Sequence, residues 1–281
     1  MASSVSTEWE CTHERAYWFD DTFFTKRETF PHEYIRNLEG QIVSPPTNSK
    51  ARLENEFNIL QFIKANSNIP VPEAELTTVM PGSLPCLQTK IANGVQLSGA
   101  EAAEVALADA EVLSLRTKLA TGIPLCDVGV DDLEAAIARV DIELKESILP
   151  QMAALRSDTL GGLNREHEYV LTAPWVGQFS RPLCRVQSRT LTLCHNDLSQ
   201  GNIFVDAETF KITCIIDWEY SGWFPPNFEA ELWKKPLTSG DWPDPIEQRA
   251  ELLNIGAVPL LARAHERFNS LVDVLRSAKF W

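Results

Sequence analysis

The sequence predicts an α+β protein of two lobes, with a shortened β-rich lobe over residues 1–92 and a larger, mainly helical lobe over residues 93–281. Before residue 95, short extended pieces surround a single clear helix. Beyond it, apolar residues recur at helical spacing over long stretches, and one short β-rich island interrupts them. A chain of 281 residues is long enough to bury a core in each of two lobes.

The helix of the N-terminal lobe is predicted over residues 51–66. Its apolar side chains recur near one face at the i, i+4, i+7 spacing, namely Leu53, Phe57, Leu60 and Ile63. Residues 69–72 read Ile-Pro-Val-Pro, and because proline fixes its own backbone and restricts the residue before it, this segment is extended and ends the helix. Residues 84–91 are then expected to form a strand that leads out of the lobe.

Long helices are expected in the C-terminal lobe. Residues 99–119 are rich in alanine, the strongest helix former. Asp131 and Glu134 resemble a capping box that opens a second helix, and the apolar stripe of that helix stops at Pro150. The same spacing predicts a last helix through residues 261–275. Such stripes face a core, and we assign them no function.

The composition excludes several kinds of partner. Lys and Arg number 25 against 39 Asp and Glu, a net charge of −14, and no basic stripe offsets it. A surface of this charge repels phosphate backbones, so no nucleic-acid partner is expected. No stretch approaches the ~18 apolar residues of a membrane span, and the first ten residues lack the basic and apolar regions of a signal peptide. We therefore expect a cytoplasmic protein with no membrane partner.

Six cysteines are scattered along the chain without a Cys-x-x-Cys pair or a histidine cluster at metal spacing. This pattern predicts reduced thiols that pack as small apolar groups, with no structural zinc and no disulfide framework.

The residues that can carry chemistry gather in the β-rich island. Three short apolar runs make it up, over residues 191–194, 203–205 and 211–216. The loop after the first run contains Asp197 and, five residues on, Asn202, and the third run ends at Asp217. Phosphoryl transfer needs this set of groups, with a carboxylate near the acceptor hydroxyl and hard oxygen ligands for Mg²⁺. The spacing matches the H-x-D-x-x-x-x-N catalytic loop, and Asp217 follows Asp197 by 20 residues.

A purely structural interpretation competes with this one. A His-x-Asp sequence in a loop is usually a turn in which the aspartate caps a neighbouring backbone group. The combination with Asn202 and with Asp217 and Glu219 on the next strand disfavours that interpretation for Asp197. For Glu219 both interpretations stay open, since an exposed carboxylate after a strand needs no ligand.

The two motifs, His195-Asn196-Asp197 with Asn202 and Ile215-Ile216-Asp217-Trp218-Glu219, resemble those of the aminoglycoside phosphotransferase and choline kinase superfamily, particularly fungal phosphotransferase-family proteins. The resemblance implies a protein-kinase-like fold and an ATP- and Mg²⁺-dependent transfer of the γ-phosphoryl group to a hydroxyl of a small molecule. By resemblance, Asp197 is the catalytic base and His195 orders its loop. The implied metal ligands are Asn202 and Asp217, with Glu219 in the position of an acid that relatives use for a second metal.

The resemblance also implies nucleotide-binding residues in the N-terminal lobe. Lys26 looks like the lysine that contacts the nucleotide phosphates, and Glu56 on the first helix looks like its ion-pair partner. The chemistry requires a cation near the α and β phosphates, held by a carboxylate on an adjacent helix. Glu54 is the alternative partner.

The connection between the lobes is expected at residues 89–94. By resemblance, the backbone here, including Lys90 and Ala92, hydrogen-bonds the edge of an adenine. A strand that simply runs into a turn at Asn93-Gly94 predicts the same residues.

Residues 1–25 depart from the family pattern because they contain no glycine. Kinase-like folds normally place a Gly-rich hairpin before the lysine strand, so that backbone N–H groups close over the phosphates. The hairpin is therefore absent, or replaced by the aromatic segment of residues 9–24. This departure motivates a second hypothesis: a kinase-like scaffold with weak or no nucleotide binding, acting as a binding module or catalysing a non-phosphoryl reaction in the same cleft.

A protein kinase is disfavoured, because Asp-Trp-Glu replaces Asp-Phe-Gly and no Ala-Pro-Glu element follows. The aromatic stretch of residues 223–242 is expected mostly to pack the lobe, with Trp223, Phe224 and Trp233 as candidates for the wall of an acceptor pocket. The expected partner is a small-molecule acceptor whose identity the sequence does not specify, and the protein is expected to be a monomer or homodimer.

Overall fold

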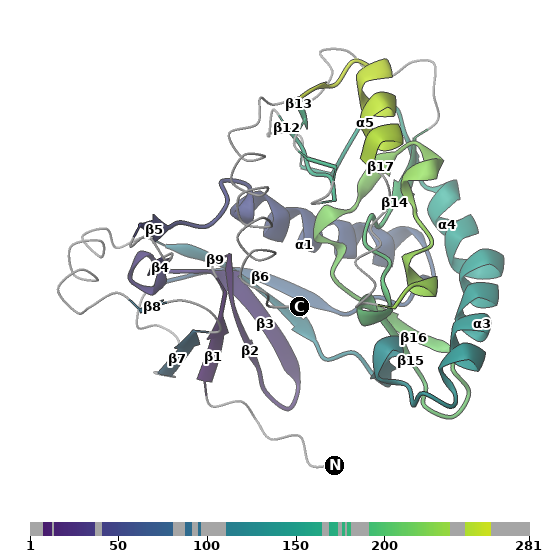
Figure 1. Ribbon diagram of the computed structural model, residues 1–281, viewed down its shortest axis with the longest axis horizontal. Coiled ribbons are helices and arrows are strands. Elements are labelled where there is room, and N and C mark those ends of the chain that lie inside the picture. Colours follow the sequence, from purple (N-terminus) through teal and green to yellow (C-terminus); the bar gives the residue numbers. More distant parts are fainter. Residues whose placement is uncertain are drawn as a thin grey trace, which may run out of the picture.

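The computed structural model describes residues 8–12, 14–36, 41–80, 88–91, 95–96, 111–164, 169–173, 176–177, 179–180, 191–236 and 245–259. These residues form a mixed α+β fold (Figure 1), with one large sheet near the N-terminus followed by helices and short sheets. No helix among them is long and apolar enough to cross a membrane. The helix predicted through residues 261–275 lies outside the described residues.

The N-terminal sheet has six strands in the order β6-β9-β3-β2-β1-β7. Strands β1, β2 and β3 form two antiparallel hairpins, and β9 lies antiparallel between β3 and β6. The parallel pair β1 and β7 completes the sheet. The strands are β1 (Glu8–Cys11), β2 (Arg15–Phe19), β3 (Phe23–Glu28), β6 (Ala74–Val79), β7 (Gln88–Ile91) and β9 (Val112–Lys118). A second, small sheet consists of β4 (Ile35–Arg36), β5 (Ile42–Val43) and β8 (Val95–Gln96).

The first two hairpins close without glycine. Between β1 and β2, Thr12 Oγ1 accepts the backbone N–H groups two and three residues on, at 3.2 and 3.1 Å. Between β2 and β3, Asp20 Oδ1 accepts the N–H groups two and three residues on, both at 2.8 Å. Side chains here supply the turn hydrogen bonds. Of the two alternatives left open by the sequence, the hairpin is therefore replaced rather than absent.

Strand β9 bears on two expectations from the sequence. The helix predicted over residues 99–119 is wrong for residues 112–118, and residues 99–110 lie outside the described part of the chain. Alanine is concentrated before residue 111, whereas the strand reads Val-Leu-Ser-Leu-Arg-Thr-Lys and pairs on both sides with β3 and β6. Pairing and burial on both sides decide the conformation here, over helix propensity.

The second expectation concerns the connection between the two halves of the molecule. Residues 88–91 form β7, which confirms this part of the strand predicted over residues 84–91, while residues 84–87 lie outside the described part of the chain. Strand β7 lies at the edge of the sheet beside β1. The chain returns to the sheet at β9 and leaves it through residues 119–122 to β10 (Ile123–Pro124). The chain thus re-enters the large sheet after residues 89–94, where the connection was predicted, before it reaches β10. We propose that the boundary between lobes, predicted after residue 92, lies after Lys118.

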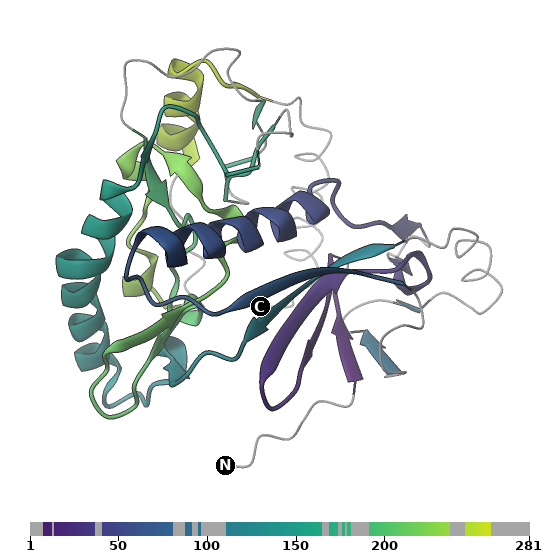
Figure 2. The same ribbon diagram turned by 180° about the vertical axis from the view of Figure 1, so that it is seen from behind.

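Helix α1 (Ser49–Asn66) confirms the helix predicted for the N-terminal lobe, and it ends before the proline segment as predicted. It lies across one face of the sheet, between the sheet and the C-terminal half (Figure 2). Its buried side chains include apolar residues, but also Arg52, Asn55 and Glu56. These three polar side chains contact the C-terminal half and β3, as described below.

In the described part of the C-terminal half, three helices combine with three short sheets. The helices are α3 (Leu133–Glu143), α4 (Leu149–Ala154) and α5 (Pro245–Asn254). The first sheet has the order β10-β15-β16 and the second β11-β14-β17, while the third is β12-β13-β18. Their remaining strands are β15 (Ile203–Val205), β16 (Ile212–Ile215), β11 (Arg156–Ser157), β14 (Leu191–Cys194), β17 (Gly222–Phe224), β12 (Tyr169–Val170), β13 (Phe179–Ser180) and β18 (Val258–Pro259). The three runs of the predicted β-rich island are β14, β15 and β16, which confirms it.

The helix predicted to stop at Pro150 continues past it. One turn of π-helix, Leu144–Ile148, joins α3 to α4, and Pro150 lies at the start of α4. Proline has no N–H to donate and its ring clashes with the preceding turn, so a widened turn before it lets the helical path continue. The predicted capping box is not formed, because α3 begins after Asp132, whose side chain makes no capping bond.

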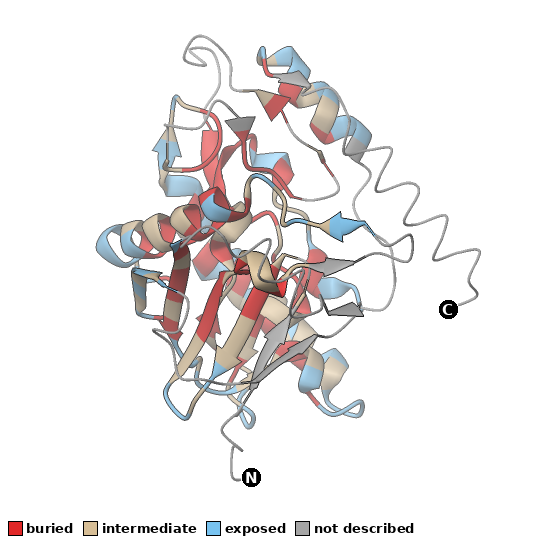
Figure 3. Ribbon diagram, turned by 90° about the vertical axis from the view of Figure 1, so that its left-hand side faces the viewer, coloured by how far each residue is buried: buried red, intermediate tan, exposed pale blue. Residues whose placement is uncertain are grey.

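The apolar core joins the stripe of α3 to the short sheets, and Figure 3 shows the buried residues on inner strands and helix faces. Trp223, Phe224 and Trp233 belong to this core, at 5%, 0% and 0% exposure. Both indole N–H groups are paired, that of Trp223 with the backbone oxygen of Leu155 and that of Trp233 with Asp141 Oδ1, each at 3.0 Å. Core packing rather than a pocket wall is thus their observed role.

Candidate active site

The loop after β14 is held in place by the buried ring of His195. Its Nε2 lies 2.9 Å from the backbone oxygen of Ile216, and its Nδ1 accepts the backbone N–H of Asp197 at 3.2 Å. These bonds require a neutral ring with the proton on Nε2. Burial lowers the pKa of His195 to about 4, which keeps the ring neutral. His195 therefore positions the loop through backbone contacts.

Asp197 lies on this loop and is half-buried. Burial, reinforced by the charge of Asp217, raises its pKa to about 7, against hydrogen bonds from Ser199 and Asn202. Within the described part of the chain, Asp197 Oδ1 is buried with no hydrogen-bond partner. Asn202 Nδ2 also donates to the backbone oxygen of Asp197 at 2.9 Å. A carboxylate with a pKa near 7 and an unpaired oxygen is suited to accept a proton at neutral pH.

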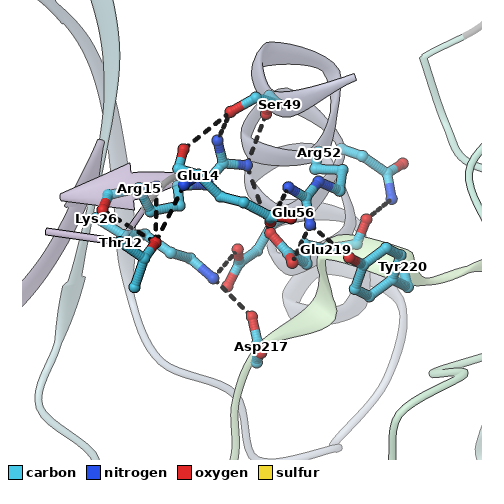
Figure 4. Close-up of polar contacts among 11 residues, drawn as sticks. Thr12, Glu14, Arg15, Lys26, Ser49, Arg52, Glu56, Asp217, Glu219 and Tyr220 are labelled. Carbon is cyan, nitrogen blue, oxygen red and sulfur yellow. Dashed lines mark hydrogen bonds and ion pairs between the residues drawn. The ribbon is translucent and has the colours of Figure 1, made fainter. Parts of the chain in front are cut away.

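Lys26 lies at the centre of the site, where the two halves of the molecule meet (Figure 4). Its Nζ forms an ion pair with Glu56 of α1, and it lies 2.7 Å from Oδ1 of Asp217, which follows β16. The predicted pairing of Lys26 with Glu56 is present. The alternative partner, Glu54, instead accepts a hydrogen bond from Asn164 at 3.0 Å.

The ionisation of Lys26, Glu56 and Asp217 follows from their burial and from the sharing of one ammonium by two carboxylates. Burial alone would lower the pKa of Lys26, but Asp217 and Glu56 outweigh it, so the pKa is raised and the ammonium stays charged. Burial also opposes the charge on Asp217, yet Lys26 holds the pKa of that carboxyl below its usual value. Burial raises the pKa of Glu56 to about 7, because its share of the single ammonium does not offset desolvation.

The backbone at the end of β16 presents Asp217 toward Lys26. Asp217 has φ 64°, and Asn196 on the facing loop has φ 66°. The left-handed region is uncommon for residues other than glycine, although Asp and Asn tolerate it best. Trp218 fixes the turn. The centroid of its ring lies 4.4 Å from that of the His195 ring, and its Nε1 donates to the backbone oxygen of Ile215 at 2.9 Å.

The residues present fit a magnesium ion at Asp217 and Asn202. The carboxylate oxygens of Glu56, Asp217 and Glu219 lie within 4.8 Å of one another, a spacing that could hold a cation. Of these, Asp217 is the most accessible, at 35% side-chain exposure. The amide nitrogen of Asn202 is used by the loop, so its amide oxygen is the atom suited to a hard cation.

Sequence reasoning missed Glu229. Its Oε2 accepts the backbone N–H of His195, and its carboxylate also accepts that of Asn196, so it binds the two residues before Asp197. Burial raises the pKa of Glu229 to about 8, despite these hydrogen bonds. A lone acid 32 residues beyond Asp197 has no motif around it, so only the fold reveals that it holds the loop.

The residues predicted to contact an adenine are not brought to this site. Lys90 lies on β7 opposite Glu10 of β1, at the far edge of the sheet from β9. Ala92 lies outside the described residues. Contact of Lys90 and Ala92 with a nucleotide stays a prediction.

The model of the phosphotransferase enzyme family, APH, matches residues 13–252. The chain belongs to this family. The match includes β2 and β3 with Lys26, α1 with Glu56, and the loops with Asp197 and Asp217. The family resemblance inferred from the sequence motifs is thereby confirmed.

Several solved structures resemble the phosphotransferase chain at low sequence identity. An aminoglycoside-3'-phosphotransferase of type VIII is 16% identical, with 88% of this chain and 84% of that chain covered and a TM-score of 0.43. The aminoglycoside phosphotransferase APH(3'')-Id from Streptomyces rimosus, in complex with ADP and streptomycin, is 14% identical over 92% and 89%, with a TM-score of 0.43. A variant of aminoglycoside 2'-phosphotransferase-IIIa, in complex with GDP, is 11% identical over 98% and 92%, with a TM-score of 0.45. No curated protein matches the chain. Family membership rests on the family model, because these TM-scores are low.

Proposed function

We propose that the protein is an ATP- and Mg²⁺-dependent phosphotransferase, a small-molecule kinase that moves the γ-phosphoryl group to a hydroxyl of its acceptor. One observation carries the proposal. Lys26 is held between Glu56 and Asp217, at the junction of the sheet with the loops that contain Asp197 and Asn202. Phosphoryl transfer depends mainly on positioning and electrostatic stabilisation, and this arrangement supplies a fixed cation beside a cation-binding carboxylate.

Each residue has a distinct role in this proposal. Lys26 binds the nucleotide phosphates, and Glu56 keeps its ammonium in place. Asp197 accepts the proton of the acceptor hydroxyl at its unpaired Oδ1. Asn202 and Asp217 would hold Mg²⁺, which when bound neutralises charge on the phosphates. His195 and Glu229 hold the catalytic loop without touching the reacting atoms.

We also place the adenine edge against the backbone of residues 119–122, in a protein-kinase-like arrangement of two lobes. This segment follows β9, the neighbour of the Lys26 strand, and leads directly to β10, which pairs with β15 beside the catalytic loop. Gly122 is required there. It has φ +93°, and a Cβ would approach the backbone oxygen of Val205 to 2.2 Å. The connection is thus packed closely against the catalytic half.

The alternative is a kinase-like scaffold with weak or no nucleotide binding, motivated by the glycine-free hairpin between β1 and β2. A thermal-shift titration with Mg·ATP and Mg·GTP separates the two, because a ligand that binds only the folded state raises stability with concentration. We expect a concentration-dependent shift with at least one of the two nucleotides.

Phosphoryl transfer to a panel of small hydroxyl compounds should then be lost in Asp197→Asn, which keeps the shape of the side chain but not its basicity. Absence of any shift at millimolar nucleotide would favour the scaffold. Full transfer by Asp197→Asn would contradict the role of Asp197.

A further inference from the structure

A cluster of buried and half-buried charged and polar side chains lies beside Lys26 and links three segments of the chain. It consists of Glu14 and Arg15 from the β1–β2 hairpin, Ser49 and Arg52 from α1, and Glu219 and Tyr220 after β16; Figure 4 shows all six. We call this set the arginine clasp. Arg15 and Arg52 are only 2% and 3% exposed, so their charges must be met inside the protein.

Arg52 binds all three segments at once. Its Nη2 lies 2.6 Å from Glu14 Oε2, and its Nη1 lies 3.0 Å from Glu219 Oε1 and also donates to the hydroxyl of Tyr220. Because Arg52 belongs to α1, one guanidinium joins the hairpin and the segment after Asp217 to this helix.

Arg15 completes the clasp from the start of β2. Its Nη2 donates to the backbone oxygen of Ser49 at 2.6 Å, and its Nη1 donates to the Ser49 hydroxyl. The same Nη2 lies 3.5 Å from Glu219 Oε2. Each carboxylate oxygen of Glu219 therefore faces a different guanidinium, and the side chain is only 12% exposed.

Glu219 is already paired with cations. The carboxylates of Glu56, Asp217 and Glu219 face three cations, Lys26, Arg15 and Arg52, and Glu14 shares Arg52 with Glu219. A divalent ion bound by all three carboxylates would lie among three positive groups, with Glu219 forced to give up its arginines. Asp217 is more exposed and contacts only Lys26 among these cations, so it has one ion pair rather than two to weaken, and its second carboxylate oxygen is not part of that pair.

We propose that Glu219 is a positioning residue rather than a metal ligand: held by Arg15 and Arg52, it fixes the glycine-free β1–β2 hairpin and helix α1 to the segment that presents Asp217. The hairpin that would cover the phosphates is thus anchored before a ligand arrives. The consequence for nucleotide affinity rests on the proposed function, whereas the anchoring itself does not.

Hydrogen exchange of the ligand-free protein tests the anchoring. Arg52→Met and Glu219→Gln should each speed exchange in the peptide covering residues 14–19 by about tenfold or more, since both release the hairpin. Exchange in the double variant should be only slightly faster than in the faster-exchanging single variant, because the effects of removing two partners of one network are not additive. Lys50→Met is the control, since Lys50 lies on the same helix with 63% side-chain exposure outside the clasp. Unchanged exchange in both single variants would overturn the proposal.

If Arg52→Met does not fold, Glu14→Gln gives the same readout. This variant leaves both arginines paired with Glu219. It removes the charge that the hairpin presents to Arg52, and Glu14 is 32% exposed. Faster exchange at residues 14–19 supports the clasp, and wild-type exchange contradicts it.

Binding of Mn²⁺ to the protein with ATP, followed by electron paramagnetic resonance, tests the second half of the proposal. Glu219→Gln should keep the wild-type number of bound ions, with an affinity within about threefold, while raising KM for the nucleotide more than KM for the acceptor. Asp217→Asn should lose the ion. Loss of one Mn²⁺ in Glu219→Gln would show that Glu219 is a ligand. A wild-type protein that binds no nucleotide refutes the proposed function, while the exchange measurement still decides the clasp.

Discussion

Replacing Lys26 by methionine probes both the stability and the chemistry of the site. Methionine keeps an unbranched apolar chain and removes the ammonium that pairs with Glu56 and Asp217. Glu56 is only 2% exposed, so its carboxylate would be left buried without its cation. Removing one partner of a buried ion pair costs about 3–5 kcal/mol, and protonation of Glu56 limits the loss to the lower part of that range.

A second variant separates the two effects. Glu56→Gln leaves Lys26 paired with Asp217, so we expect a loss of only about 1–2 kcal/mol. The double variant Lys26→Met with Glu56→Gln buries no uncompensated charge at residue 56, and it should recover most of the stability lost by Lys26→Met. It should not recover phosphoryl transfer, because the cation for the phosphates is still missing.

Urea unfolding at pH 7 gives the free energy of unfolding of each variant, and initial rates give kcat. Lys64→Met is the matched control. Lys64 pairs with Glu73 at 3.2 Å, but both side chains are more than half exposed, so a change within about 1 kcal/mol is expected. A loss below about 1 kcal/mol for Lys26→Met, or no recovery in the double variant, would refute the assignment of a buried, charged Lys26–Glu56 pair.

Three further predictions concern the loops around this pair. Glu229→Ala should cost about 2–6 kcal/mol in urea unfolding, because it leaves the backbone N–H groups of His195 and Asn196 unpaired, whereas Glu229→Gln keeps an acceptor oxygen and should stay within about 1 kcal/mol. Equal losses in the two variants would contradict this role. The folded-state pKa of His195 is lowered from 6.5 to about 4, so its contribution to stability is present above pH 6.5 and is lost as the pH falls through 4, by ~3 kcal/mol. Its ring carbon signals in an NMR titration should stay those of the neutral form at pH 5, and a midpoint near 6.5 would contradict burial. Gly222→Ala should lower stability by about 3 kcal/mol, because a Cβ would lie 2.5 Å from the backbone carbon of Gly161; a wild-type melting temperature would show that β17 and the segment around Gly161 separate at low cost.

The sequence identified the parts of the site that depend on local spacing. Asp197 and Asn202 lie on one loop, and Asp217 ends the strand paired with β15, so a short motif determines their proximity. The pairing of Lys26 with Glu56 followed from the family resemblance, and the structure contains it.

Residues whose contacts span long sequence separations could not be found in this way. Arg15 and Arg52 meet Glu219 only because the β1–β2 hairpin, α1 and the end of β16 converge in space. Charged residues on a strand and a helix normally indicate solvent-facing positions, and nothing local marks these as buried. Glu229 is hidden for the same reason.

The error at β9 has a different physical origin. Val112–Lys118 follows an alanine-rich stretch, so a window of local propensity extends the helix across it. Its conformation is set by pairing with β3 and β6, which lie far away in sequence. Strand β9 is also the last strand of the large sheet before the chain reaches β10, which is why we propose the boundary between lobes after Lys118.

Isothermal titration calorimetry with ATP and Mg²⁺ tests the central claim most directly, in the wild-type protein and in Asp217→Asn. The predicted result is Mg²⁺-dependent binding of ATP to the wild type, with loss of the Mg²⁺ dependence in the variant, because Asp217 is the accessible carboxylate beside Lys26. Equal Mg²⁺-dependent binding by both proteins, or no binding of nucleotide by the wild type, would contradict it.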